Sequence, residues 1–281
     1  MSETEIVWEF IMKLLDLRKE LKSEFASLNI ETEDVDFIIS EVLRVKRTDL
    51  ILIVEISAEQ ETEIRKNCGL RKNNVPVDKI FKKAYFYGLT FYVNENVLSP
   101  RPESELLVET ALKYIKQNNY KTALDLCTGS GCLAIATKLN CEIEMSASDI
   151  SQKALTVAKQ NAKNLNAEIK FIRSNMFEKI EDKFDLIISN PPYIDSDEVK
   201  TLEKEVINND PHLALDGGAM GLKFYNIIHD NLRKHLNDNG MIIMEIGEDQ
   251  KELLISLFND FDLVESLKDL SGNDRVLIFK K

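Results

Sequence analysis

The chain has 281 residues, of which 44% are hydrophobic and 30% are charged, a composition typical of a globular protein with one large and one small domain. Its formal net charge of -12 argues against a broad surface for naked DNA or RNA, because such surfaces gain most of their affinity from cations on phosphates. The longest apolar runs are too short to span a bilayer, and no positively charged segment opens the chain as a signal peptide would. The four cysteines form no C-x-x-C pair, so we expect free thiols, a cytoplasmic protein and no metal site.

The first 75 residues predict a small helical domain. Apolar side chains recur at helical spacing over residues 8–21, including Trp8 and Ile11, and again over residues 35–43. Residues 50–56 suit a strand and a helix alike, and we assign them to a helix because of their neighbours. Since no group of catalytic side chains occurs in this region, we interpret it as a domain for substrate recognition.

Local signals mark the ends of these helices. Thr32 precedes the second apolar stripe as a helix cap. Ser57 and Gln60 have the spacing of a capping box at the start of a third helix, and Gly69 would end that helix.

A linker with a β-hairpin follows over residues 76–98. Aromatic and β-branched residues flank Gly88-Leu89, which we expect to form a type II′ turn. Two prolines, Pro100 and Pro102, then interrupt regular structure before a helix over residues 103–116. The remaining domain would extend over residues 99–281.

From Lys121 onward, strands and helices alternate, a pattern typical of a doubly wound, mostly parallel sheet. Seven strands are expected over residues 122–126, 143–148, 169–172, 184–189, 241–246, 263–267 and 275–279. Helices are expected over residues 132–139, from Ser151 to 164, and over residues 222–236 and 251–258. Because no helix separates the last two strands, the final strand should be antiparallel.

A glycine-rich turn, Asp125-Leu-Cys-Thr-Gly-Ser-Gly131, follows the first strand and opens a helix. Such a turn brings backbone N–H groups close to a ligand. Asp149 ends the second strand, where a carboxylate can accept hydrogen bonds from the two ribose hydroxyls of an adenosine cofactor. The pattern G-x-G-x-x-G is absent, which favours an adenosine ligand without a pyrophosphate over NAD. The alternative is a plain tight turn with an exposed aspartate.

The segment from Asp185 to Tyr193 reads as a buried strand followed by Asn-Pro-Pro-Tyr. Asn190 then lies at the carboxyl edge of the sheet, where ligands of such sheets bind. Its amide oxygen, the carbonyl of Pro191 and the ring of Tyr193 could hold a planar NH2 group, on an amide or on a base. The alternative is a simple turn, since adjacent prolines are typical of turns.

These motifs together resemble the class I S-adenosylmethionine-dependent methyltransferases with a Rossmann-like fold. Within them the chain is similar to the HemK/PrmC family, the protein-(glutamine-N5) methyltransferases of peptide chain release factors. The resemblance is carried by residues 87–94, 98–105, 124–131 and 189–194, and is extended by residues 215–218, 221–225, 245–247 and 269–275. It implies transfer of a methyl group from S-adenosyl-L-methionine to the glutamine of the GGQ motif of class 1 release factors. It also implies no membrane and no direct nucleic-acid substrate, with a role in translation termination.

The resemblance also assigns roles to residues. The cofactor would have its methionine end at Cys127, Thr128, Gly129, Ser130 and Gly131, its ribose at Asp149 and its adenine beside Met176. The substrate glutamine would be held by Asn190, Pro191, Pro192 and Tyr193, and Asn190 would also contact the cofactor. Cys127 replaces the first glycine of the usual motif, and Asn175 stands where an acidic residue is common.

Several roles stay open from the sequence. Arg101 and Glu103 would lock the linker to the catalytic domain, and Glu245 would be structural or contact the substrate. Alternative functions are methylation of a ribosomal-protein glutamine, methylation of adenine N6 in a nucleic acid, and a non-enzymatic cofactor-binding protein.

Overall fold

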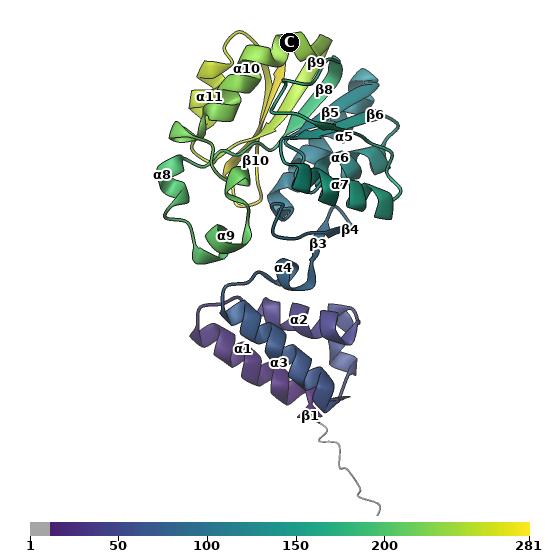
Figure 1. Ribbon diagram of the computed structural model, residues 1–281, viewed down its shortest axis with the longest axis vertical. Helices are drawn as coiled ribbons and strands as arrows, with labels where there is room; N and C mark the ends of the chain where they lie inside the picture. Colours follow the sequence, from purple (N-terminus) through teal and green to yellow (C-terminus); the bar gives the residue numbers. More distant parts are fainter. Residues whose placement is uncertain (1–11) are drawn as a thin grey trace, which may run out of the picture. The chain divides into compact units, whose positions relative to one another are not determined.

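The computed structural model describes residues 12–281, and the chain divides into two compact units, Met1–Phe81 and Lys82–Lys281 (Figure 1). Each unit has its own hydrophobic core. None of the helices among residues 12–281 is long and apolar enough to cross a membrane.

The first unit is a bundle of helices around one core. Its helices are α1 (Leu14–Ser27), α2 (Glu33–Leu43), α3 (Ala58–Lys72) and α4 (Val77–Phe81). Their apolar faces meet in a cluster whose fully buried members include Leu17, Leu21, Phe25, Ile38 and Ile64. The expected helix over residues 35–43 is therefore present, and α1 covers the part of residues 8–21 that the structure describes; Trp8 and Ile11 lie outside that part.

The predicted capping box of α3 is confirmed. The Ser57 hydroxyl accepts a hydrogen bond from Gln60 N at 3.3 Å, and Ser57 N donates to Gln60 Oε1 at 2.9 Å. The other two end signals were wrong in detail. Thr32 precedes α2, but its hydroxyl bonds the Glu33 carboxylate instead of a backbone N–H, and α3 continues through Gly69 to Lys72 because helix hydrogen bonding tolerates an interior glycine.

The helix expected over residues 50–56 was also wrong. Arg47–Leu52 forms a 3₁₀ helix, and Glu55–Ile56 forms strand β2, which pairs antiparallel with β1 (Met12–Lys13). The β-branched residues of this run favour extended backbone, and the alternation of exposed Glu55 with buried Ile56 suits a strand.

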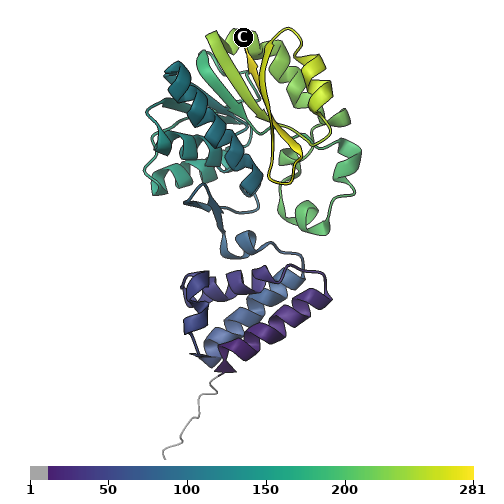
Figure 2. The same cartoon turned by 180° about the vertical axis from the view of Figure 1, so that it is seen from behind.

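The second unit contains the predicted seven-stranded sheet, in the order β10-β11-β9-β8-β5-β6-β7. Its strands are β5 (Thr122–Leu126), β6 (Glu144–Asp149), β7 (Lys170–Arg173), β8 (Phe184–Ser189), β9 (Leu236–Glu245), β10 (Asp262–Lys268) and β11 (Asp274–Lys280). Neighbouring strands pair parallel except β11, which is antiparallel to both β9 and β10, so the expected antiparallel last strand is confirmed. Figure 2 shows β10 and β11 as the yellow hairpin of this sheet, with β10 at its edge.

Helices cover both faces of the sheet (Figure 1). Helices α5 (Glu105–Asn118), α6 (Cys132–Asn140) and α7 (Gln152–Asn164) lie on one face, and α10 (Lys223–His235) and α11 (Lys251–Leu257) lie on the other. Alternate residues of a strand serve the two cores: Met241 and Ile243 of β9 face α5 and α6, whereas Ile242 and Met244 face α10 and α11. The predicted Ser151 cap of α7 is confirmed, since its hydroxyl accepts from Ala154 N at 3.1 Å.

The hairpin of β3 (Lys83–Phe86) and β4 (Leu89–Tyr92) belongs to the second unit. Its turn residues are Tyr87 and Gly88, with φ of 50° and 71°. Two successive positive φ values define a type I′ turn, so the expected type II′ turn at Gly88-Leu89 was wrong. The right-handed twist of the strands suits either turn, and the register Phe86 opposite Leu89 selects this one.

The long segment after β8 is organised by short elements. These are α8 (Ser196–Val199), α9 (Lys204–Asn209) and the 3₁₀ turns His212–Ala214 and Ala219–Gly221. Residues 215–217 return to pair with Ile194, because Ile194 N donates to Leu215 O at 3.1 Å and Gly217 N donates to Ile194 O at 2.8 Å. This pairing fixes the chain directly after Asn-Pro-Pro-Tyr.

Candidate active site

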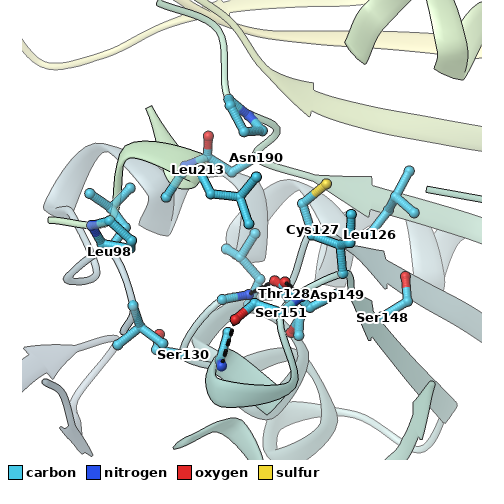
Figure 3. A pocket seen from close by; sticks show the side chains of 18 of the residues that line it. Leu98, Leu126, Cys127, Thr128, Ser130, Ser148, Asp149, Ser151, Asn190 and Leu213 are labelled. Atoms are coloured by element: carbon cyan, nitrogen blue, oxygen red, sulfur yellow. Dashed lines mark hydrogen bonds between the residues drawn. The ribbon is translucent and has the colours of Figure 1, made fainter. Parts of the chain in front are cut away.

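A cavity of about 380 Å³ lies at the carboxyl ends of β5, β6 and β8. Figure 3 shows Asn190 and Leu213 on one side of it and Thr128, Asp149 and Ser151 on the opposite side. The carboxyl ends of parallel strands are the usual ligand edge of an open sheet, and the sequence placed both the glycine-rich turn and Asn190 there.

Asp125, at the end of β5, shapes the glycine-rich turn. Its Oδ2 accepts a hydrogen bond from the Thr128 hydroxyl at 2.6 Å and another from Ala134 N at 3.1 Å. Complete burial raises the pKa of Asp125 to about 7, and these two donors partly offset that effect. The turn that results exposes backbone to the cavity, since a Cβ built on Gly129 would meet no atom within 4 Å.

Asp149 closes the turn from the neighbouring strand. One carboxylate oxygen accepts from Gly129 N at 2.9 Å, and the other accepts from Ser151 N at 2.8 Å. Burial raises the pKa of Asp149, and the backbone donors counteract that shift. A carboxylate oxygen can accept two hydrogen bonds, so each oxygen keeps one lone pair for a ligand in the cavity.

The residues present suit an adenosylated ligand. The hydroxyls of Ser130 and Ser148 are buried at the cavity lining with no hydrogen-bond partner among the residues that the structure describes. Such orphan groups are costly and indicate a ligand or ordered water. Met176 lies beside Cys127, with 3.6 Å between their sulfur atoms, and provides an apolar surface.

The two departures from the usual motif have visible consequences. Cys127 has φ of +66°, a region where a side chain costs roughly 1–2 kcal/mol relative to glycine, so the turn keeps its shape against local strain. Asn175 lines the cavity, but its side-chain nitrogen donates to Glu178 Oε1 at 2.7 Å.

The sequence resemblance implies that S-adenosylmethionine binds here with its ribose at Asp149. On that expectation, replacing Asp149 with alanine should weaken its binding by at least about tenfold, because a charged acceptor for hydroxyl groups contributes roughly 1.5–3 kcal/mol. Isothermal titration calorimetry measures the effect, and circular dichroism checks that the fold persists. The matched control is Asp182→Ala, an aspartate paired with Lys170 on the surface. Equal cofactor affinity in the Asp149 variant and the control would show that the ribose does not bind here.

Asn190 directly follows β8 and borders the cavity together with Pro192. Its side-chain nitrogen donates to the Ser104 hydroxyl at 3.3 Å. Six of the other predicted residues also line the cavity: Cys127, Thr128, Gly129, Ser130, Asp149 and Met176. Its described lining does not include Gly131, Pro191 or Tyr193. The Tyr193 hydroxyl donates to Glu245 Oε1 at 3.3 Å, and burial raises the pKa of this tyrosine.

The structure gives the contacts of Arg101, Glu103 and Glu245, whose roles the sequence did not decide. Arg101 pairs with Asp210 at 3.2 Å, and Glu105, not Glu103, bonds the hairpin through Tyr87 N at 2.6 Å. Glu245 is only 3% exposed and accepts hydrogen bonds from the hydroxyls of Ser104 and Tyr193, and it is not among the residues that line the cavity, which favours the structural role.

Two supporting residues gave no signal in the sequence. Asn161, in the last turn of α7, donates to Ser130 O at 2.9 Å and also bonds the backbone of Tyr92 in the hairpin. Gln250 donates to Tyr193 O at 2.9 Å. Only a buried polar residue within an otherwise apolar helix face could have pointed to Asn161.

Comparisons with known proteins show which family the chain belongs to. The family described as "Methyltransferase small domain" matches residues 99–236. The chain is 38% identical over 278 residues to the release factor glutamine methyltransferase of Thermodesulfovibrio yellowstonii, covering 96% of this chain and 99% of that protein. It is 37% identical to the protein of the same name from Clostridium acetobutylicum, covering 95% and 96%.

Solved structures show the same fold at low identity. A methyltransferase from Pyrococcus furiosus matches with a TM-score of 0.53 and 16% identity, over 76% of this chain and 98% of that chain. The 16S rRNA N2 G1207 methyltransferase of T. thermophilus, solved with AdoMet and guanosine, has a TM-score of 0.50 and 16% identity over 71% and 49% of the two chains. From its near full-length similarity to the curated relatives, the chain belongs to the release factor glutamine methyltransferase family.

Proposed function

We propose that this protein transfers a methyl group from S-adenosyl-L-methionine to the side-chain amide nitrogen of the glutamine in the GGQ loop of class 1 peptide chain release factors. The observation that carries the proposal is the placement of Asn190 on the same cavity as Gly129 and Asp149. A site for the cofactor and an amide acceptor for the substrate therefore lie together, in a chain whose full-length relatives bear this activity in their names.

In this proposal, Asp149 would accept the ribose hydroxyls, residues 127–131 would surround the methionine portion, and Met176 would lie against the adenine. S-adenosylmethionine supplies an electrophilic methyl group on a positively charged sulfur. Asn190 and the Pro191 carbonyl orient the acceptor in line with that methyl group. Pro191 and Pro192 fix φ in this segment, and Tyr193 anchors it through its hydrogen bond to Glu245. Orientation of this kind can lower a barrier by several kcal/mol, up to roughly 7–11 kcal/mol in ideal cases.

A carboxamide nitrogen is a weak nucleophile because its lone pair is delocalised into the carbonyl group. When Asn190 Oδ1 and Pro191 O accept hydrogen bonds from its two N–H groups, electron density on the nitrogen increases. No side chain has to remove a proton before the attack, because the N-alkylated amide is strongly acidic and loses its proton afterwards. The three histidines fit this scheme, since none of them is among the residues that line the cavity. His229 bonds Asp260, His235 stacks on Phe177 and His212 lies near Asp216.

One assay tests the substrate. The protein is incubated with S-adenosylmethionine labelled in the methyl group and, separately, with release factor, ribosomal proteins, DNA and RNA. Label in release factor, lost when its GGQ glutamine is changed to alanine, is the expected result. Label in ribosomal protein or in nucleic acid alone would reject the proposal in favour of those substrates.

We also propose that the helical first unit recognises the release factor. Ile51, Leu52 and Val54 are adjacent in the chain and are 82%, 77% and 68% exposed. Isolated apolar side chains on a surface are ordinary, but three within four positions provide an apolar patch for a protein partner. The pairing of β2 with β1 places this patch near the start of α1.

The double variant Ile51→Gln/Leu52→Gln is therefore expected to raise KM for intact release factor by about tenfold or more, since burying an exposed apolar side chain of this size contributes roughly 1.5–3 kcal/mol. The value of kcat and the affinity for the cofactor should stay the same. Leu28→Gln is the matched control, because Leu28 is 54% exposed and follows the opposite end of α1. An unchanged KM in the double variant would contradict the role of this patch.

A release factor substrate also implies where the protein acts. Translation termination takes place in the cytoplasm, and we assign the protein to that compartment. Its four cysteines are free thiols, which agrees with a reducing environment.

A further inference from the structure

Asn190 is connected to a buried carboxylate through one hydroxyl group. Asn190 Nδ2 donates to Ser104 Oγ at 3.3 Å, and Ser104 Oγ donates to Glu245 Oε2 at 2.5 Å. Ser104 and Glu245 are each 3% exposed, and they are 141 positions apart in the sequence. The contact joins the 3₁₀ turn before α5 to the end of β9, and Ser104 itself lines the cavity.

The hydrogen atoms in this chain of contacts can be counted. An ionised carboxylate only accepts hydrogen bonds, so the single hydrogen of Ser104 is committed to Glu245. The Ser104 oxygen then faces Asn190 as an acceptor and requires the NH2 end of the Asn190 amide. The oxygen end of that amide is consequently the end that can receive a hydrogen from a substrate.

Both oxygens of the Glu245 carboxylate accept a hydrogen bond from a hydroxyl group, Oε2 from Ser104 at 2.5 Å and Oε1 from Tyr193 at 3.3 Å. Burial raises the pKa of Glu245, and the Ser104 hydroxyl, the positive charge of Arg275 and the Tyr193 hydroxyl reduce that shift. Glu103 is the acidic neighbour that acts in the opposite direction. Tyr193 also links the same carboxylate to the other end of the Asn-Pro-Pro-Tyr segment, at 3.3 Å.

We propose that Ser104 and Glu245 are positioning residues that fix the Asn190 amide with its oxygen directed to the substrate. A side-chain amide can otherwise rotate by half a turn and present two donors instead of an acceptor, which would repel the NH2 group of a glutamine. This inference deepens the proposed glutamine methylation and rests on it. It assigns no catalytic contact to Ser104 or Glu245, which act only through Asn190.

A double-mutant cycle tests the coupling. Single-turnover methyl transfer to release factor is measured for the wild type, Ser104→Ala, Asn190→Ala and the double variant. Ser104→Ala is expected to lower the rate by about tenfold, the equivalent of one lost hydrogen bond, with cofactor affinity unchanged by calorimetry. Ser104 itself lines the cavity, so the cycle also tests a direct contact with the reactants. If Ser104 acts through Asn190, the double variant should be no slower than Asn190→Ala alone. Effects that multiply would overturn the proposal.

Conservative variants separate positioning from packing. Ser104→Thr keeps the hydroxyl and should retain a rate close to that of the wild type. Glu245→Gln keeps the side-chain volume and should lower the rate, because a neutral amide can donate as well as accept and no longer fixes the direction of the Ser104 hydrogen. Tyr225→Phe is the control: its hydroxyl donates to the backbone carbonyl of Glu245 at 2.7 Å and does not touch the carboxylate. A slow Ser104→Thr variant, or a Tyr225→Phe variant as slow as Glu245→Gln, would overturn the proposal.

A second readout does not depend on methyl transfer. The side-chain NH2 signals of Asn190 in a ¹⁵N correlation spectrum are identified by their loss in Asn190→Ala. They should shift in Ser104→Ala and Glu245→Gln and stay in place in Tyr225→Phe. Signals that fail to move in the first two variants would overturn the positioning role even if the wild type is active. A wild type without glutamine methylation whose signals do move would instead reject the proposed function.

Discussion

Replacing Asn190 with alanine is expected to lower kcat for methyl transfer by about 10²–10³, the typical loss when one preorganised hydrogen-bonding partner of a transition state is removed. The contact between Asn190 Oδ1 and the reacting nitrogen should strengthen as that nitrogen begins to bond the methyl group. Interactions that strengthen in the transition state lower the barrier, whereas equal binding in both states does not. Single-turnover methylation of release factor measures the effect directly.

Asn190→Asp is a second variant, whose expected rate of methyl transfer is intermediate. Aspartate keeps an acceptor but loses the NH2 group that donates to Ser104, so its rate should fall between those of the wild type and the alanine variant. Both variants should bind the cofactor, because Asp149 and the glycine-rich turn are unchanged. An alanine variant within about tenfold of the wild-type rate would show that Asn190 does not clamp the substrate.

The sequence was sufficient for the features that depend on local pattern. The alternation of apolar runs and helical stripes predicted all seven strands of the sheet, with boundaries within one or two residues for most and an earlier start for β9, at Leu236. The antiparallel β11 followed from the missing helix before it, since a parallel return needs a crossover of a dozen or more residues. The glycine-rich turn, Asp149 and Asn190 were placed at one edge because parallel strands bring their carboxyl ends together.

The parts that failed depend on contacts between distant segments or on competing local preferences. Residues 50–56 were assigned by their neighbours, and only the pairing with Met12–Lys13 shows why Glu55–Ile56 is extended. The turn of the hairpin was shifted by one residue, because Tyr87 adopts a positive φ that its side-chain type does not suggest.

The sequence singled out Glu245, but the contacts among the supporting residues of the site were hidden for the same reason. Ser104 and Glu245 are far apart in sequence, and a serine near a helix start reads as an ordinary cap. Gln250 lies in a short helix start and gives no sign that it bonds the carbonyl of Tyr193. No spacing rule relates these residues, because the sheet brings them together only after folding.

Gly221 shows how closely the return segment is packed against the clamp. A Cβ built on Gly221 would lie 1.9 Å from Tyr193 O and 2.4 Å from Gln250 Nε2, and the residue has φ of +67°. The nearest atom belongs to the backbone, so the neighbour cannot simply rotate away. An alanine here must displace the Tyr193 carbonyl and break its hydrogen bond from Gln250.

Gly221→Ala is therefore expected to lower the free energy of unfolding by about 3 kcal/mol or more, because it overpacks a buried site. It should also lower kcat by at least about 10²-fold, because a shift of the clamp by roughly 1 Å misaligns the acceptor. Urea denaturation and single-turnover methylation measure the two effects. Gly272→Ala is the matched control: Gly272 has φ of +88°, but a Cβ there would meet nothing within 4 Å. That variant carries only the backbone penalty of roughly 1–2 kcal/mol, and its kcat should equal that of the wild type. If both variants lose the same stability and both keep their turnover, the packing of Gly221 against Tyr193 does not hold the clamp in position.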